Sequence, residues 1–172
     1  MNLNDDDFAL FGLPEQFAQD RDAIDARWKE MQREAHPDKF AAQGAAAQRV
    51  AMQWSVRINE AYQRLKDPLK RAAYLCELRG APINAENNTA MPADFLVEQM
   101  EWREALDEAQ DESALDGLNY KLSAARKDAI ARIAALLDDT GDAGAASQQV
   151  RALMFIERFG ADVEARYEQL DR

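Results

Sequence analysis

The spacing of hydrophobic and polar residues along the chain is typical of helices. In most segments apolar residues recur three and four positions apart, and no run shows the strict alternation between turn signals that is typical of strands. We therefore predict an all-α protein. The predicted helices cover residues 5–11, 21–34, 45–66, 69–78, 93–110, 112–137 and 145–170.

The second and third predicted helices each carry one apolar stripe and should form an antiparallel hairpin. Proline disfavours the α conformation of the residue before it, so Pro37 ends the second helix, which Asp20 begins as N-cap. The stripe of the second helix consists of Ile24, Trp28, Met31 and Ala35. The stripe of the third consists of Ala47, Val50, Trp54, Ile58, Ala61 and Leu65.

Turn-forming residues separate the two halves of the chain. Proline, asparagine and glycine gather between residues 80 and 93, and a second such stretch at 138–144 separates the last two helices. Three helices joined by short connections favour an antiparallel bundle. We therefore expect one domain at 1–79, a linker at 80–92 and a three-helix domain at 93–172.

Charge differs strongly between these halves. The net charge of the chain is −11; residues 1–79 hold 12 Lys/Arg and 13 Asp/Glu, whereas residues 80–172 hold 9 and 19. An acidic chain without a basic arm is a poor nucleic-acid binder. No stretch approaches the roughly 18 apolar residues that a membrane helix needs, and the first residues lack the features of a secretory signal. We expect a cytoplasmic protein that binds neither nucleic acid nor membrane.

The chain has one cysteine, Cys76, and one histidine, His36. This nearly excludes a zinc or iron–sulfur site built from such ligands, so we expect no cofactor and no metal. Cys76 lies in an apolar helical run, where burial is the expected role; a Cys–His nucleophile is the less favoured alternative.

The sequence His36-Pro37-Asp38-Lys39-Phe40 lies between two amphipathic helices and resembles the signature loop of J-domains. Residues 58–68, Ile-Asn-Glu-Ala-Tyr-Gln-Arg-Leu-Lys-Asp-Pro, resemble the end of the third J-domain helix. Two further segments indicate which J-protein family the chain resembles. They are Phe-Ala-Leu-Phe-Gly-Leu-Pro at 8–14 and Phe-Leu-Val-Glu-Gln-Met-Glu-Trp-Arg-Glu-Ala-Leu-Asp-Glu at 95–108. With these segments, nearly the whole chain resembles the HscB family, the J-type co-chaperones of bacterial iron–sulfur cluster assembly.

That resemblance implies a fold and a function. The fold would be an N-terminal J-domain and a C-terminal three-helix domain in an L-shaped arrangement. The protein would bind the cluster scaffold IscU, deliver it to the chaperone HscA and stimulate the HscA ATPase, so that ATP is hydrolysed by the partner and not by this chain. The chain lacks the paired Cys-x-x-Cys motifs of some eukaryotic relatives and is similar to the bacterial, metal-free form.

A basic face on the second helix continues into the His-Pro-Asp loop. Lys29, Gln32, Arg33 and His36 fall on one side of the helix, away from its apolar stripe. Such a face is either merely solvated or a docking surface for an acidic patch, and the resemblance favours docking. His36 alone could instead be a helix-terminal histidine stabilised by the helix dipole. The expected chaperone-binding residues are Lys29, Arg33, His36, Pro37, Asp38, Lys39 and Phe40.

The helix at 93–110 carries two apolar faces. Phe95, Trp102, Leu106 and Ala109 should pack into the bundle, whereas a second apolar group shares its side with glutamates. An exposed apolar patch rimmed by charge marks a protein-binding site; the alternative, a helix buried on both sides, fits the glutamates poorly. The resemblance assigns the same face to the scaffold, with Phe155 from the last helix. The expected scaffold-binding residues are Leu96, Val97, Met100, Glu101, Glu104, Glu108 and Phe155.

Two other functional classes are disfavoured. General J-proteins usually add Gly/Phe-rich segments and cysteine-rich zinc modules, which this sequence lacks. An enzyme is disfavoured because there is no Gly-rich phosphate loop, nucleophile elbow or cluster of metal ligands. We expect a monomer, although the apolar patch leaves self-association open.

Overall fold

The computed structural model describes residues 2–171, and within that range the regular structure is entirely helical, which confirms the all-α prediction. None of the helices in this range combines the length and hydropathy needed to cross a membrane.

The pattern of contacts divides the chain within the fourth helix into two compact units, one up to Leu75 and one from Cys76 onward. The elements are α1 (Asp7–Phe11), α2 (Arg21–Ala35), the 3₁₀ helix η1 (Pro37–Gln43), α3 (Ala45–Lys66), α4 (Pro68–Leu78), α5 (Ala93–Glu108), α6 (Glu112–Ala134), the π-helical turn η2 (Ala135–Asp139) and α7 (Ala143–Leu170).

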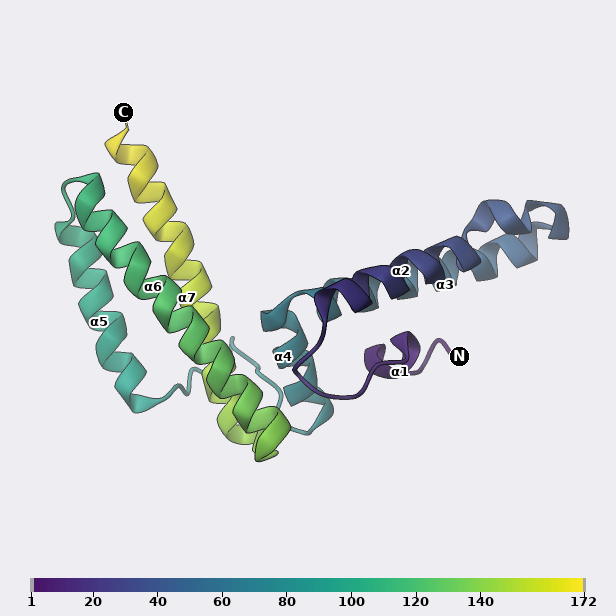
Figure 1. Cartoon of the computed structure of the whole chain (residues 1–172), viewed down its shortest axis with the longest axis horizontal. Coiled ribbons are helices and arrows are strands. Elements are labelled where there is room, and N and C mark those ends of the chain that lie inside the picture. Colours follow the sequence, from purple (N-terminus) through teal and green to yellow (C-terminus); the bar gives the residue numbers. More distant parts are fainter. Residues whose placement is uncertain (1, 172) are drawn as a thin grey trace. The chain divides into compact units, whose positions relative to one another are not determined.

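In the first unit, α2 and α3 lie side by side as the predicted hairpin, with η1 at its tip (Figure 1). The core of this unit is formed by Phe8, Leu10, Phe11, Ile24, Met31, Ala51, Ile58, Ala61 and Leu65. One stripe position was predicted wrongly, because Val50 is 51% exposed and Ala51 is buried. Both residues are apolar, so periodicity alone does not distinguish them.

Polar side chains join α2 to α3 along a second line of contact, which we call the polar seam. The side-chain oxygen of Asn59 accepts hydrogen bonds from Trp28 Nε1 at 2.9 Å and from Gln32 Nε2 at 2.8 Å. Ser55 Oγ donates to Gln32 Oε1 at 2.9 Å. Gln32 therefore faces α3, and its predicted place on the basic face was wrong, because these partners lie on the neighbouring helix.

A buried carboxylate fastens α1 to α3. Asp7 is fully buried and accepts two hydrogen bonds from the Arg64 guanidinium, at 2.6 and 2.9 Å. Arg57 lies 2.9 Å from the same carboxylate and also donates to the backbone carbonyls of Leu3 and Asp5. Since a buried charge needs paired and hydrogen-bonded partners, these two arginines make the burial of Asp7 possible.

In the second unit, α5, α6 and α7 pack together as three helices, with α6 and α7 in the longest contact (Figure 1). Aspartates cap two of them: Asp111 accepts from the amide of Ala114, and Asp142 from that of Ala145. Because Asp142 is the cap, α7 begins at Ala143, two residues before the predicted start. The core is formed by Phe95, Trp102, Leu106, Leu115, Leu118, Leu122, Ile133, Val150, Leu153, Ile156, Phe159 and Val163.

The segment between α4 and α5 is held against the second unit by Arg151. This arginine is 4% exposed and donates from Nε to the carbonyl of Ile83 at 3.1 Å and from a terminal nitrogen to that of Ala90 at 3.0 Å. Arg79 similarly donates to the carbonyl of Leu137. Arg151 thus fastens the predicted linker to the second unit at two points, the carbonyls of Ile83 and Ala90.

Cys76 is completely buried, as predicted, and this burial raises the pKa of its thiol to about 11. At about pH 8 the thiolate fraction should be on the order of a thousandth, so we expect the folded protein to react very slowly with a thiol reagent such as Ellman's reagent. Unfolding in guanidinium should release one reactive thiol. A Cys76→Ala variant carrying Leu78→Cys, at a position 41% exposed, is the reactive control. Rapid stoichiometric labelling of the folded wild-type protein would contradict this expectation.

Candidate functional site

The His-Pro-Asp loop is built by local hydrogen bonds. His36 has an extended backbone, which ends α2, and Pro37 begins η1. The Nδ1 atom of His36 accepts a hydrogen bond from the amide of Asp38 at 3.2 Å, and the His36 carbonyl accepts from the amide of Lys39 at 3.0 Å. His36 therefore acts as the N-cap of η1 and fixes the backbone on which Asp38 is carried.

The side chain of Asp38 is free for an external partner. It is 91% exposed, against 57% for His36, and its carboxylate lies 3.7 Å from His36 Nδ1. The hydrogen bond at this cap uses the Asp38 backbone amide, so the shape of the loop does not depend on the carboxylate. A largely exposed carboxylate on a preorganised turn is suited to binding a cationic donor.

Lys29 and Arg33 lie one turn apart on α2 and are both exposed. Neither forms an ion pair with any residue between 2 and 171. With Lys39 on η1, they give three exposed positive charges on the two elements that flank His36. The structure thus places five of the predicted chaperone-binding residues, Lys29, Arg33, His36, Asp38 and Lys39, on accessible surface.

Phe40 has a different position from the rest of the loop. It is half-buried and lines an apolar groove of about 430 Å³ together with Met31, Ala47, Val50, Ala51 and Trp54. Its ring therefore helps to seat η1 against α3, and Pro37, also half-buried, begins this same helix. The exposed side chain of Val50 lies on the wall of this groove, which accounts for its departure from the core.

The second predicted site lies on α5. Leu96, Val97 and Met100 are 48%, 57% and 74% exposed, while Phe95, Trp102 and Leu106 on the same helix are buried. This confirms the two apolar faces of the helix. We call the exposed one, formed by Leu96, Val97 and Met100, the α5 crest. It lies among exposed glutamates at 101, 104 and 108.

Phe155 is half-buried, so only part of its side chain is exposed at this surface. Its centroid lies 5.8 Å from that of Phe95 in an edge-to-face contact and 5.8 Å from that of Phe159 in a stacked one. Phe155 is therefore an extension of the core that reaches the surface. There it lines a shallow groove between α5 and α7 with Gln99, Met100, Arg103, Glu104, Asp107 and Glu108.

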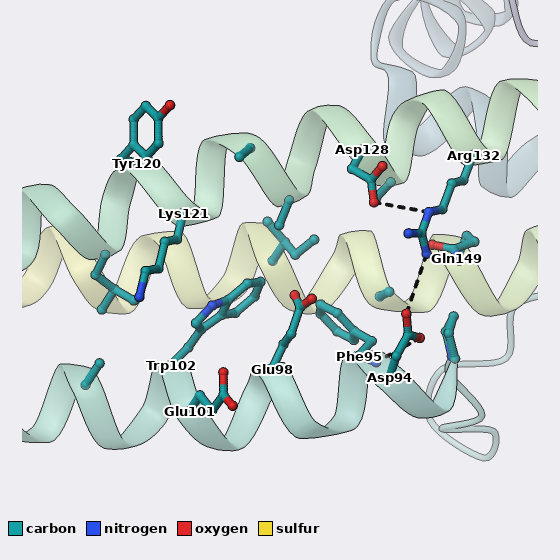
Figure 2. Close-up of a pocket in the computed structure, with 18 residues that line it drawn as sticks. Asp94, Phe95, Glu98, Glu101, Trp102, Tyr120, Lys121, Asp128, Arg132 and Gln149 are labelled. Carbon is teal, nitrogen blue, oxygen red and sulfur yellow. Dashed lines mark hydrogen bonds and ion pairs between the residues drawn. The ribbon is translucent and has the colours of Figure 1, made fainter.

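The structure brings some of the predicted scaffold-binding residues together and separates others. Met100, Glu104, Glu108 and Phe155 share the groove on the α7 side of α5. Glu101 instead lines a second groove, between α5 and α6 (Figure 2). The predicted residues therefore occupy the crest and both flanks of α5 rather than one flat patch.

Sequence reasoning missed Arg103, which lies in the groove on the α7 side. Its guanidinium is 5.5 Å from the centroid of Phe159 and 3.9 Å from a carboxylate oxygen of Asp162. The groove thus holds one cation among acidic neighbours. Arg103 lies three residues after Met100, and this spacing in the sequence indicates that the two side chains share one side of the helix.

Known proteins resemble the chain over its whole length. The family model described as the HSCB C-terminal oligomerisation domain matches residues 91–164. A co-chaperone protein HscB homolog from Paraburkholderia phymatum is 52% identical over 99% of this chain and 98% of its own length. A homolog of the same name from Burkholderia mallei is 49% identical and covers 99% of each chain.

Solved structures agree with these relatives. Chaperone HscB from Vibrio cholerae is 36% identical, with a TM-score of 0.82 over 96% of this chain and 99% of that one. Human co-chaperone protein HscB is 24% identical, with a TM-score of 0.88 over 97% of this chain and 84% of that one, and supports the fold alone.

Proposed function

The chain belongs to the HscB family of co-chaperones, and from that premise we propose that it is an adaptor with two binding sites. The second unit binds an IscU-type iron–sulfur scaffold, and the first delivers it to an HscA-type chaperone and stimulates the chaperone ATPase. The observation that carries the proposal is that each compact unit has its own exposed site: the His-Pro-Asp loop in one and the α5 crest in the other. We also propose a cytoplasmic location, as the likeness to the bacterial, metal-free form implies.

At the chaperone site, this protein supplies recognition and leaves the chemistry to its partner. Lys29 and Arg33 steer and orient an acidic surface of the chaperone, because unpaired charges raise association rates and fix register. Asp38 then accepts a hydrogen bond from a cation of the chaperone. Stimulation follows if this contact is stronger in the hydrolysing conformation than in the resting one, since a ligand shifts an equilibrium only by its differential affinity.

At the scaffold site, the α5 crest supplies apolar anchors and the glutamates supply orientation. Leu96 and Met100 would be covered by apolar side chains of the scaffold, which removes exposed hydrophobic surface from water. Glu104 and Glu108 would face basic residues of the scaffold around this centre. This arrangement, an apolar centre within a charged rim, is typical of specific protein interfaces.

The test uses three purified proteins: this chain, an HscA-type ATPase and an IscU-type scaffold. Wild-type protein should bind the scaffold and raise the ATPase rate. Leu96→Asp, which places a charge on the crest, should lose scaffold binding yet keep ATPase stimulation by the chain alone. If the wild-type protein neither binds the scaffold nor stimulates the ATPase, the proposal is wrong.

Scaffold affinity should fall as salt is added. The screening length shrinks from about 10 Å at 0.1 M to about 3 Å at 1 M, so exposed glutamate contacts weaken. We expect a several-fold loss of affinity between about 0.05 M and about 0.5 M NaCl, measured by calorimetry. A variant with Glu101, Glu104 and Glu108 changed to glutamine should bind more weakly at low salt and respond less to salt. Equal salt responses of the two proteins would exclude the glutamates from the interface.

A further inference from the structure

A groove between α5 and α6, which we call the α6-side groove, lies on the α6 side of α5 and is also lined by Gln149, Ala152 and Ile156 of α7 (Figure 2). Its volume is about 480 Å³, a size that accommodates a large side chain or a short segment of a partner. Phe95 and Trp102 reach from α5 into the space between the helices. The rest of the lining comes from α5, α6 and α7 and is mostly small or aliphatic: Ala105, Leu118, Ala124, Ala125, Ala129, Ala152 and Ile156.

One end of the groove is closed by an internal charge network. Arg132 on α6 lies 3.1 Å from a carboxylate oxygen of Asp128 and 3.8 Å from one of Asp94 on α5 (Figure 2). Arg132 is thus shared by two carboxylates, and its charge is satisfied within the domain. These contacts hold the end of α5 to α6 and leave recognition to the charges farther along the groove.

Those remaining charges have no internal partners. Glu98 and Glu101 stand on the α5 wall and Lys121 on the α6 wall, and none of the three forms an ion pair within residues 2–171. Two free carboxylates thus face a single ammonium group across an apolar floor. This pattern is complementary to an apolar side chain that has a basic residue next to it.

An aromatic residue at the lip of the groove is largely exposed. Tyr120 on α6 lines the groove and is 78% exposed, more than any other exposed large hydrophobic residue in the described chain. In Figure 2 its ring projects away from the helices. Tyrosine offers a large apolar area with a polar end at low entropic cost, which is why it is enriched in interfaces.

We propose that the scaffold-binding surface continues from the α5 crest into the α6-side groove, which receives an apolar side chain of the scaffold flanked by a basic residue. Glu101 connects the two surfaces, because it belongs to the predicted scaffold-binding set and also lines this groove. The basic residue faces Glu98 and Glu101, and the ring of Tyr120 turns from its outward position to cover the inserted side chain. This inference rests on the proposed scaffold binding and adds to it a second contact region on α6.

The first test compares scaffold affinities by calorimetry. A Glu98→Gln and Tyr120→Ala double variant should bind the scaffold about tenfold more weakly, because it loses a charge contact and an aromatic cover. Both side chains are exposed, so the variant should fold. Glu164→Gln, an exposed change on α7 outside the groove, is the matched control and should alter affinity less than about twofold.

The second test uses a spectroscopic probe in the wall of the groove. Trp102 is the single tryptophan of the second unit, whereas Trp28 and Trp54 lie in the first. We expect unlabelled scaffold to shift the fluorine resonance of 5-fluorotryptophan at position 102 and to leave the other two unchanged. In the double variant, this shift at saturation should become smaller.

Two outcomes separate the inference from the proposed function. Wild-type affinity in the Glu98→Gln and Tyr120→Ala variant, together with strong loss in a Leu96→Ala and Met100→Ala variant, would overturn the groove contact and leave scaffold binding standing. Wild-type affinity in the second of these variants would overturn the site on the α5 crest itself.

Discussion

Asp38→Asn is expected to return the rate of an HscA-type ATPase to its unstimulated value. The substitution keeps the shape of the side chain and removes the negative charge, and this carboxylate is 91% exposed. The loop should keep its conformation, because His36 caps the backbone amide of Asp38 and not its side chain. The variant should therefore match the wild-type protein in thermal unfolding and in scaffold affinity while failing to stimulate the ATPase.

The measurement is steady-state ATP hydrolysis by the chaperone over a range of concentrations of this protein. Asp22→Asn is a matched control, because Asp22 is an exposed aspartate of the same unit at the start of α2. It should stimulate as the wild-type protein does. Full stimulation by Asp38→Asn would show that the chaperone does not recognise this carboxylate.

Replacing Leu96 and Met100 together by alanine is expected to weaken scaffold binding by about 2–4 kcal/mol, or roughly 30-fold to 1,000-fold. Both side chains project from the α5 crest, at 48% and 74% exposure, so truncating them leaves no cavity in the folded protein. Leu96→Ala with Phe155→Ala should also weaken binding. Phe155, however, contacts the rings of Phe95 and Phe159, and its loss would disturb the core as well.

Calorimetric titration with the scaffold measures this loss. The control is a Met52→Ala and Val56→Ala variant, which removes two similarly exposed apolar side chains, 56% and 52% exposed, from α3 in the other unit. It should bind the scaffold with wild-type affinity. An affinity of the Leu96 and Met100 variant within about twofold of the wild type would remove the α5 crest from the interface.

Local chemistry explains why so much of the fold could be predicted from the sequence. The bounds of α3, Ala45–Lys66, agree with the prediction because Gly44 precedes it and Asp67-Pro68 follows it. The exposure of the α5 crest was predictable because one helix of a three-helix bundle can bury only one face. Such signals reside in a few neighbouring residues and need no knowledge of the rest of the chain.

Features that depend on two helices at once could not be predicted in this way. Periodicity does not decide between Val50 and Ala51, since the choice depends on how closely α2 approaches α3. The sequence pattern predicts that Gln32 is a surface residue, whereas its position is set by hydrogen bonds with Asn59 and Ser55 on α3. The same is true of the α6-side groove, whose lining combines residues of α5, α6 and α7.

The polar seam between α2 and α3 has an evolutionary consequence. Apolar contacts tolerate small sliding of one helix along another, whereas the amide of Asn59 accepts from Trp28 and Gln32 at 2.9 and 2.8 Å only in one alignment. Substitution of Asn59 would remove the acceptor of Trp28 Nε1 and leave Gln32 Nε2 with the Ser55 carbonyl at 3.3 Å alone, and would favour compensating changes at both. We expect these three positions to vary together among relatives, because they fix the alignment on α3 of α2, the helix that carries Lys29.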